Sequence, residues 1–99
     1  MTSYIARQLP GARVVKCFNT MTWETIRDPN FNAVAATAFL CGDDDSAKAT
    51  VAGLATEIGL DTADLGPLSQ AAVQDSILVV FFGLAQTYGR NVALKVLHR

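Results

Sequence analysis

The stretch from Thr37 to Leu65, TAFLCGDDDSAKATVAGLATEIGLDTADL, decides the fold. Its first five residues, Thr37–Cys41, form an apolar run that predicts a buried strand. The acids that follow suit the start of a helix, and Gly59 suits its end. Between them one apolar stripe recurs at helical spacing: Ala47, Val51, Leu54, Ala55 and Ile58. Leu60–Leu65 predicts another strand, so the stretch indicates a βαβ unit.

The residues before this stretch add one more strand. Tyr4–Leu9 resembles the last turns of a helix, which Pro10-Gly11 ends. Arg13–Phe18 is a short β-prone run that suits a strand covered on both faces. Met21–Arg27 predicts a short amphipathic helix, and Phe31–Ala36 an extended link.

The residues after it predict helices. Leu68–Tyr88 is a long helical segment, and Arg90–Leu97 predicts a final short helix. Ile77–Ala85 is apolar on every side, so such a helix must be covered all round. Because a chain of this size rarely supplies that cover, we expect a second chain or a further domain against it.

These elements predict an α/β fold in one domain, residues 1–99. We expect an incomplete Rossmann-like architecture with a small, mainly parallel sheet of about three strands. Helices flank the sheet, and a long apolar helix ends the chain. A sheet this small has exposed edges, which is unusual for an independent domain.

Composition and charge exclude some classes of function. The 99 residues carry 8 Lys and Arg against 9 Asp and Glu, and the basic residues are scattered singly. Binding to nucleic acid requires basic residues grouped on one face, so nucleic acid is not expected as a partner. The N-terminus has no apolar signal segment, and Ile77–Ala85 is about half the length that spans a bilayer. We therefore expect a soluble, cytoplasmic chain with no membrane partner.

The search for reactive groups is mostly negative, and we assign no catalytic residue and no metal ligand. No two glycines have the G-x-G spacing of a dinucleotide-binding turn. His98 lies next to the C-terminus and is interpreted as a solvated residue. Asp43-Asp44-Asp45 is explained by capping of the following helix rather than by metal binding.

Two cysteines and one lysine allow two interpretations each. Cys17 and Cys41 lie in apolar runs and are interpreted as reduced, small hydrophobic residues in adjacent strands. A disulfide or redox pair is the alternative if those strands are neighbours. Lys16 is either an edge lysine whose ammonium reaches water or a positive charge beside an anionic ligand.

The residues Phe18-Asn19-Thr20-Met21 follow the first strand at its carboxyl end. In open α/β sheets ligands bind at this end of the strands. Asn19 and Thr20 either cap the next helix or line a binding site, and the sequence does not decide between the two.

Three segments and the C-terminus together resemble the coenzyme F420-dependent NADP oxidoreductases. LPGARVVKCFNT (9–20) is similar to the family segment L-P-G-A-R-V-V-K-A-F-N-T, with Cys17 in place of an alanine. CGDDDSAKATVAGLATEIGL (41–60) resembles C/A-G-D-D-x-x-A-K followed by an amphipathic helix. DLGPLSQAAVQD (64–75) resembles D-A-G-P-L-S, and NVALKVLHR resembles the terminal G-F-x-x-K-L-L-R.

The resemblance implies cofactors, partners and site residues. Family members transfer hydride between NADP and the deazaflavin F420, pair as homodimers and begin with a G-x-G-x-x-G half that this sequence does not contain. The resemblance places Cys17, Phe18, Asn19 and Thr20 beside the nicotinamide and deazaflavin. It places Met21, Gly66, Pro67, Leu68 and Ser69 on the substrate side. Without that half, we expect neither cofactor to bind tightly to this chain alone.

Three hypotheses for function follow. The chain is the substrate-side part of an NADP oxidoreductase, inactive alone, or a non-enzymatic homodimeric module, or a ligand-binding domain without a dinucleotide site. Whether it is itself an enzyme stays open. In each case the partner, a second copy or a separate Rossmann-domain chain, is expected on the apolar helix Ile77 to Ala85.

Overall fold

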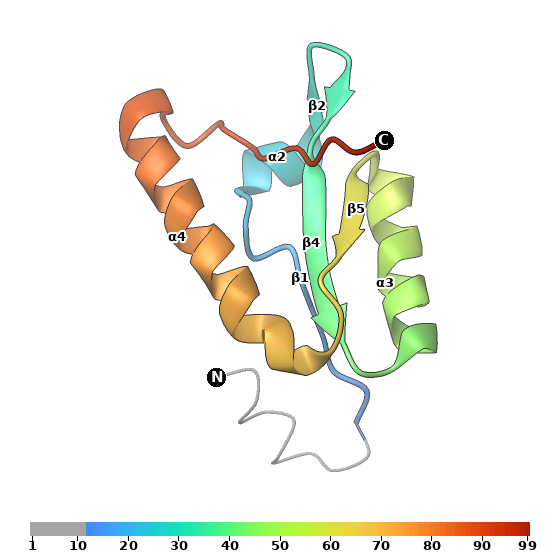
Figure 1. Ribbon diagram of the computed structural model, residues 1–99. Coiled ribbons are helices and arrows are strands. Elements are labelled where there is room, and N and C mark those ends of the chain that lie inside the picture. Colours follow the sequence, from blue (N-terminus) through green and yellow to red (C-terminus); the bar gives the residue numbers. More distant parts are fainter. Residues whose placement is uncertain (1–11) are drawn as a thin grey trace.

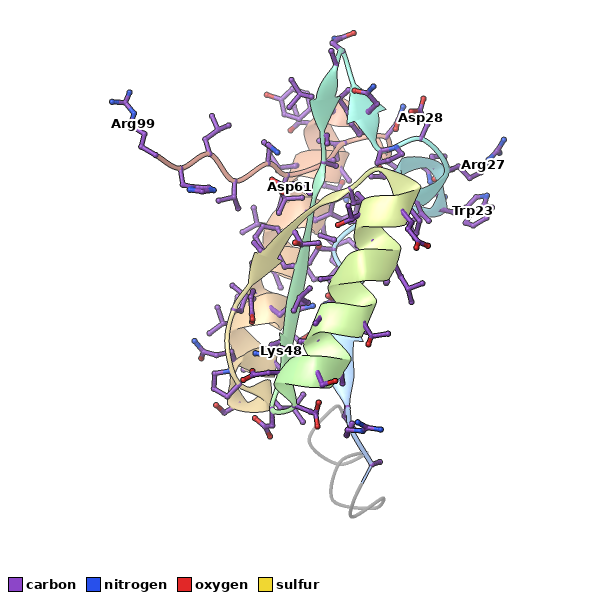
Figure 2. The ribbon with its side chains drawn as sticks, turned by 90° about the vertical axis from the view of Figure 1, so that its right-hand side faces the viewer. Trp23, Arg27, Asp28, Lys48, Asp61 and Arg99 are labelled. Carbon is purple, nitrogen blue, oxygen red and sulfur yellow. The ribbon has the colours of Figure 1, made fainter. Side chains whose placement is uncertain are left out.

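The computed structural model describes residues 12–99, so the helix expected at 4–9 lies outside the described residues. A three-stranded sheet has the order β1-β4-β5, formed by β1 (Val15–Cys17), β4 (Thr37–Gly42) and β5 (Asp61–Asp64). α3 (Asp45–Ile58) and α4 (Ala71–Tyr88) lie on opposite faces of this sheet (Figures 1 and 2). The α/β fold class, with its small sheet, flanking helices and long C-terminal helix, is confirmed.

The core lies on both faces of β4, whose six residues are all buried. On the side of α3, Ala36, Ala38, Ala55 and Leu60 form one apolar cluster. On the side of α4, Cys41, Leu68 and Ala71 form another. Because residues of a strand alternate between its faces, one continuous apolar run supplies both clusters.

The strands around β4 run in different directions. β4 and β5 are parallel and α3 joins them, as the βαβ prediction required. β1 pairs antiparallel with β4, with Cys17 opposite Leu40, which differs from the parallel crossover that strand–helix alternation suggests.

The connection between β1 and β4 explains this reversal. Its helix, α2 (Trp23–Arg27), has only five residues and is too short to cross the sheet. Instead of an extended link, a hairpin of β2 (Asn30–Phe31) and β3 (Val34–Ala35) follows. Its two turn residues, 32 and 33, both have positive φ, as a tight hairpin turn requires.

The ends of α3 follow the expected capping chemistry. The Asp44 side chain accepts a hydrogen bond from the Ala47 amide at 2.7 Å. Gly59 ends the helix with φ of 106°, in the left-handed region.

The long C-terminal helix begins with a 3-10 turn at Leu68–Gln70 and continues as α4. One face packs on β4, with Phe81 buried, while apolar side chains on the outer face are exposed, among them Val73, Val79, Val80, Phe82 and Tyr88. Helical residues 68–88 are long and apolar enough to cross a bilayer, a criterion that core helices of soluble proteins also meet. Asp75 pairs with Lys16 of β1 and attaches this helix to the sheet.

The prediction of a helix at Arg90–Leu97 is wrong. This segment is extended and crosses the end of the sheet (Figure 1). The Leu94 carbonyl accepts a hydrogen bond from the Thr37 amide at 2.8 Å, and the Val96 amide donates to Thr37 Oγ1 at 3.1 Å. Its backbone groups therefore pair with the start of β4 instead of within a helix.

Candidate functional site

The turn after β1 has an unusual backbone. Phe18 has φ of 66°, in the left-handed region that favours glycine. For a residue with a bulky side chain this conformation costs about 1–2 kcal/mol, so its surroundings must hold it. Strained residues of this kind are concentrated at functional sites, and this one lies inside the segment that the sequence selects.

A buried glutamine of α4 contacts this turn. Gln74 is fully buried, and its Nε2 donates to Asn19 Oδ1 at 2.6 Å, to the Phe39 carbonyl at 3.1 Å and to the Lys16 carbonyl at 3.3 Å. One side-chain amide thus joins α4 to β1, to β4 and to the turn. Within residues 12–99, Gln74 Oε1 and Asn19 Nδ2 are buried and have no hydrogen-bond partner.

The four residues after Cys17 do not cap a helix. The N-cap of α2 is Thr22, which makes no side-chain capping bond, so capping by Asn19 or Thr20 is ruled out. Thr20 is buried. Phe18 and Met21, like Cys17, pack against the apolar cluster on the α3 side. Asn19 is the member of this group whose polar side chain meets another element.

The second predicted segment, Gly66–Ser69, lies in the turn after β5. The Gly66 amide donates to Asp64 Oδ1 at 2.8 Å, and its φ of 102° explains the glycine. Pro67 is the N-cap of the 3-10 turn. Leu68 is buried, and its amide donates to Asp43 Oδ1 at 2.9 Å, while Ser69 is exposed.

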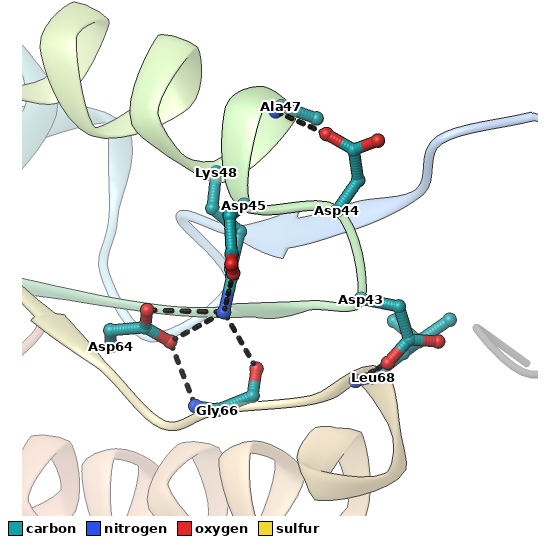
Figure 3. A network of polar contacts seen from close by, with 8 residues as sticks. All are labelled: Asp43, Asp44, Asp45, Ala47, Lys48, Asp64, Gly66 and Leu68. Atoms are coloured by element: carbon teal, nitrogen blue, oxygen red, sulfur yellow. Dashed lines mark hydrogen bonds and ion pairs between the residues drawn. The ribbon is translucent and has the colours of Figure 1, made fainter.

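A network of polar contacts holds this turn to the start of α3 (Figure 3). Lys48 is 9% exposed. Its Nζ forms an ion pair with Asp64 Oδ2 at 3.1 Å and donates a hydrogen bond to the Gly66 carbonyl at 3.4 Å. Asp45 forms a longer pair with it at 3.6 Å. The hydrogen bond with Asp64 raises the pKa of Lys48. The Gly66 amide and then Lys48 lower the pKa of Asp64.

These contacts account for the acidic run without a metal ion. Asp43 holds the Leu68 amide, Asp44 caps α3 and Asp45 pairs with Lys48. Among the described residues, His, Cys, Asp and Glu form no group that would hold a metal ion. The parallel strands β4 and β5 end at this acidic cluster, which repels the phosphates that such strand ends bind in dinucleotide folds.

The structure places the two predicted segments at opposite ends of the sheet. β1 is antiparallel and β5 parallel to β4, so the chain leaves Cys17 in one direction and Asp64 in the other. α4 connects them, because it follows the Leu68 turn and brings Gln74 to Asn19. Gln74 was not selected from the sequence. Its sequence neighbours Asp75 and Ser76 are also polar, so no local signal sets it apart.

The two cysteines are free thiols in adjacent strands, as the first interpretation held. Cys17 lies opposite Leu40 and packs toward α3, whereas Cys41 packs toward α4. Side chains on opposite faces cannot form a disulfide. Burial raises the pKa of Cys17 to about 11 and also raises that of Cys41, so both stay protonated and unreactive at neutral pH.

Lys16 lies on the edge strand, and its ammonium forms an ion pair with Asp75 of α4. Its side chain is 15% exposed. The pair supports a structural role over an anion-binding one.

The sequence matches no protein-family model. Among solved structures, the chain is similar to a protein from Arthrobacter sp. FB24 that is provisionally described as an F420-dependent NADP reductase. The identity is 33%, the TM-score is 0.88, and the match covers 98% of this chain and 46% of that one. A hypothetical protein from Sinorhizobium meliloti is 31% identical with a TM-score of 0.62, covering 99% of this chain and 43% of that one. The chain therefore spans less than half the length of either relative.

Proposed function

We propose that this chain belongs to the F420-dependent NADP oxidoreductases and forms the substrate-side part of such an enzyme. In the complete enzyme, hydride passes between NADP(H) and a deazaflavin of the F420 type or a related acceptor. The likeness to the Arthrobacter protein carries the proposal, because it extends over 98% of this chain at 33% identity. The turn Phe18–Met21 would form part of the cleft wall, with Gly66–Ser69 supporting α4 from the other end.

Within residues 12–99, the outer edge of β1 has no strand beside it, which leaves room for a neighbouring strand. β1 is the end strand of the described sheet, and shallow grooves lie on both of its faces. Arg13, Val15 and Val51 line one of them, and Val14 and Leu68 contribute to the other. The free edge of a strand carries unpaired N–H and C=O groups, so a strand of the dinucleotide-binding segment has a place to join the sheet.

The described residues do not fit the phosphates of NADP. The carboxyl ends of β4 and β5 meet Asp43, Asp44 and Asp45, and the amides there are already bonded to carboxylates. Hydride transfer needs both reactants held face to face, and the few reactive side chains here suit chemistry that the two cofactors carry. We therefore assign dinucleotide binding to a segment outside these 99 residues, in the same polypeptide or another chain.

Complementation tests the proposal. The chain is combined with the part of the Arthrobacter protein that it does not match, and NADPH-dependent loss of the deazaflavin absorbance is followed. We expect activity from the combination and none from either part alone. Assembly of the two parts without activity would contradict the enzymatic proposal and favour a non-enzymatic module. Deazaflavin binding by this chain alone, measured by calorimetry, would instead favour a ligand-binding domain.

The outer face of α4 supports a protein partner. Residues 76–89 carry no charge, and Val79, Val80 and Phe82 are more than half exposed. Exposed apolar surface of this kind marks interaction sites. We infer that a second copy, or the dinucleotide-binding chain, covers it in a soluble, cytoplasmic assembly. Sedimentation of the purified chain separates these cases: a dimer supports the homodimer, and a monomer that associates only with the dinucleotide-binding segment supports the other.

A further inference from the structure

The left-handed turn at Phe18 is contacted by a side chain from another element, α4. Glycine would adopt this backbone freely, whereas phenylalanine adopts it at a cost and returns to an extended form unless contacts prevent it. The polar contact that reaches the turn from another element comes from Gln74, which bonds to Asn19 and to the carbonyl of Lys16.

The polar atoms of Gln74 are only partly matched. Its Oε1 and the Nδ2 of Asn19 are buried without a partner among the described residues, and unmatched buried polar atoms lower stability. A leucine or methionine of similar volume would avoid the unmatched Oε1, but it would remove the donor that the Lys16 and Phe39 carbonyls and Asn19 Oδ1 share. The hydrogen bonds of the glutamine are directional, so its amide fixes the orientation of the end of β1 relative to α4 and β4.

We propose that Gln74 is a positioning residue that fixes the Phe18–Asn19 backbone at the wall of the substrate cleft. Its neighbour Asp75 forms an ion pair with Lys16. Two successive residues of α4 therefore bind β1, Gln74 through the Lys16 carbonyl and Asp75 through the Lys16 side chain. The mechanical part of this statement concerns the chain by itself. Its meaning for catalysis rests on the proposed function.

Backbone relaxation measured by nuclear magnetic resonance tests the mechanical part. In Gln74→Leu, the order parameters of Phe18 and Asn19 are expected to fall from about 0.85, typical of rigid backbone, to below about 0.6. Those of β4 stay unchanged. Gln86→Leu makes the same chemical change at an exposed position of α4 and leaves the turn rigid. A folded Gln74→Leu variant with a rigid turn would overturn the proposal.

A second variant keeps the test decisive if Gln74→Leu does not fold. Asn19→Ala removes the acceptor of the 2.6 Å bond without altering α4. We expect the same local loss of order at residue 18. If this variant leaves the turn as rigid as the native chain, the contact with Gln74 does not hold it and the proposal fails.

Activity in the complemented enzyme tests the catalytic part. Gln74→Leu is expected to lower kcat/KM for the deazaflavin by about 10- to 100-fold, because small misplacements of a cleft wall cost this much. Unchanged kcat/KM with a loosened turn overturns the positioning role. If the native combination shows no deazaflavin activity, the proposed function fails while the relaxation result still decides whether Gln74 holds the turn.

Discussion

Asp44 acts through one hydrogen bond, which its carboxylate accepts from the Ala47 amide at the start of α3. Asp44→Ala removes this cap and is expected to lower the free energy of unfolding by about 1 kcal/mol. Urea denaturation measures the change. Asp44→Asn keeps a side-chain acceptor and serves as the control, with a change of only a few tenths of a kcal/mol expected. Equal losses in both variants would contradict the capping role.

Asp64 makes stability depend on pH. Its pKa is lowered in the folded chain, by the Gly66 amide and then by Lys48, so folding favours the charged carboxylate. This contribution is complete above the unfolded pKa of about 4 and is lost as pH falls through the folded pKa. We expect Asp64→Asn to flatten the decline in stability below pH ~5. Denaturation curves at a series of pH values measure it, and an unchanged slope would rule this role out.

At the scale of elements, substitutions at two glycines test two different effects: packing between strands at Gly42 and helix propensity at Gly53. A Cβ on Gly42 of β4 would lie 2.9 Å from the Val14 carbonyl oxygen, so Gly42→Ala must push β1 away. We expect a loss of about 1–3 kcal/mol. Gly53 in α3 is exposed with nothing near its Cβ position, and Gly53→Ala is expected to gain about 0.5–1 kcal/mol. Thermal denaturation should therefore give shifts of opposite sign.

Adjacent phenylalanines of α4 face different surroundings. Phe81 is 5% exposed and Phe82 is 57% exposed. Phe81→Ala is expected to lower the free energy of unfolding by about 3–5 kcal/mol because it leaves a cavity. Phe82→Ala is expected to change the free energy of unfolding of the isolated chain only slightly. Urea denaturation at low protein concentration compares them, and similar losses would mean that Phe82 is also buried in solution.

The order of elements was largely predictable from the sequence, but the direction of β1 and the conformation of the C-terminal segment were not. The apolar period of residues 47–58 and the acids before it predicted α3 to within two residues, because capping is local chemistry. The antiparallel β1 and the extended segment after Gly89 depend on partners far along the chain, such as Leu40 and Thr37. A local pattern does not contain those partners.

The candidate site was predictable only in part. The turn at Phe18–Asn19 was selected because it follows a strand at its carboxyl end. Since β1 is antiparallel to β4, this turn lies at the end of the sheet opposite the carboxyl ends of β4 and β5, and its role in binding stays a prediction. Gln74 lies 55 residues from Asn19 along the sequence, and its spacing within an apolar helix gave no reason to pair the two. Only the fold, which lays α4 along β1 and β4, brings them together.

At the scale of the whole molecule, the proposed association can be tested on the exposed outer face of α4. Val79 is 68% exposed, and Val79→Glu places a charge on that face without touching the sheet. We expect the variant to stay folded and to associate at least about tenfold more weakly, as sedimentation equilibrium would measure. Glu57→Gln, at an exposed position of α3, is the control and should associate like the native chain. Unchanged association in Val79→Glu would place the interface elsewhere.

α4 contacts the turn at Phe18 through its buried Gln74, and its exposed outer face is the proposed site of a partner. Thermodynamic linkage is reciprocal: if a partner on the outer face changes the affinity for a ligand at the turn by some factor, that ligand changes the affinity for the partner by the same factor. Substrate concentration would then regulate assembly, and assembly would tune substrate affinity, through a single helix.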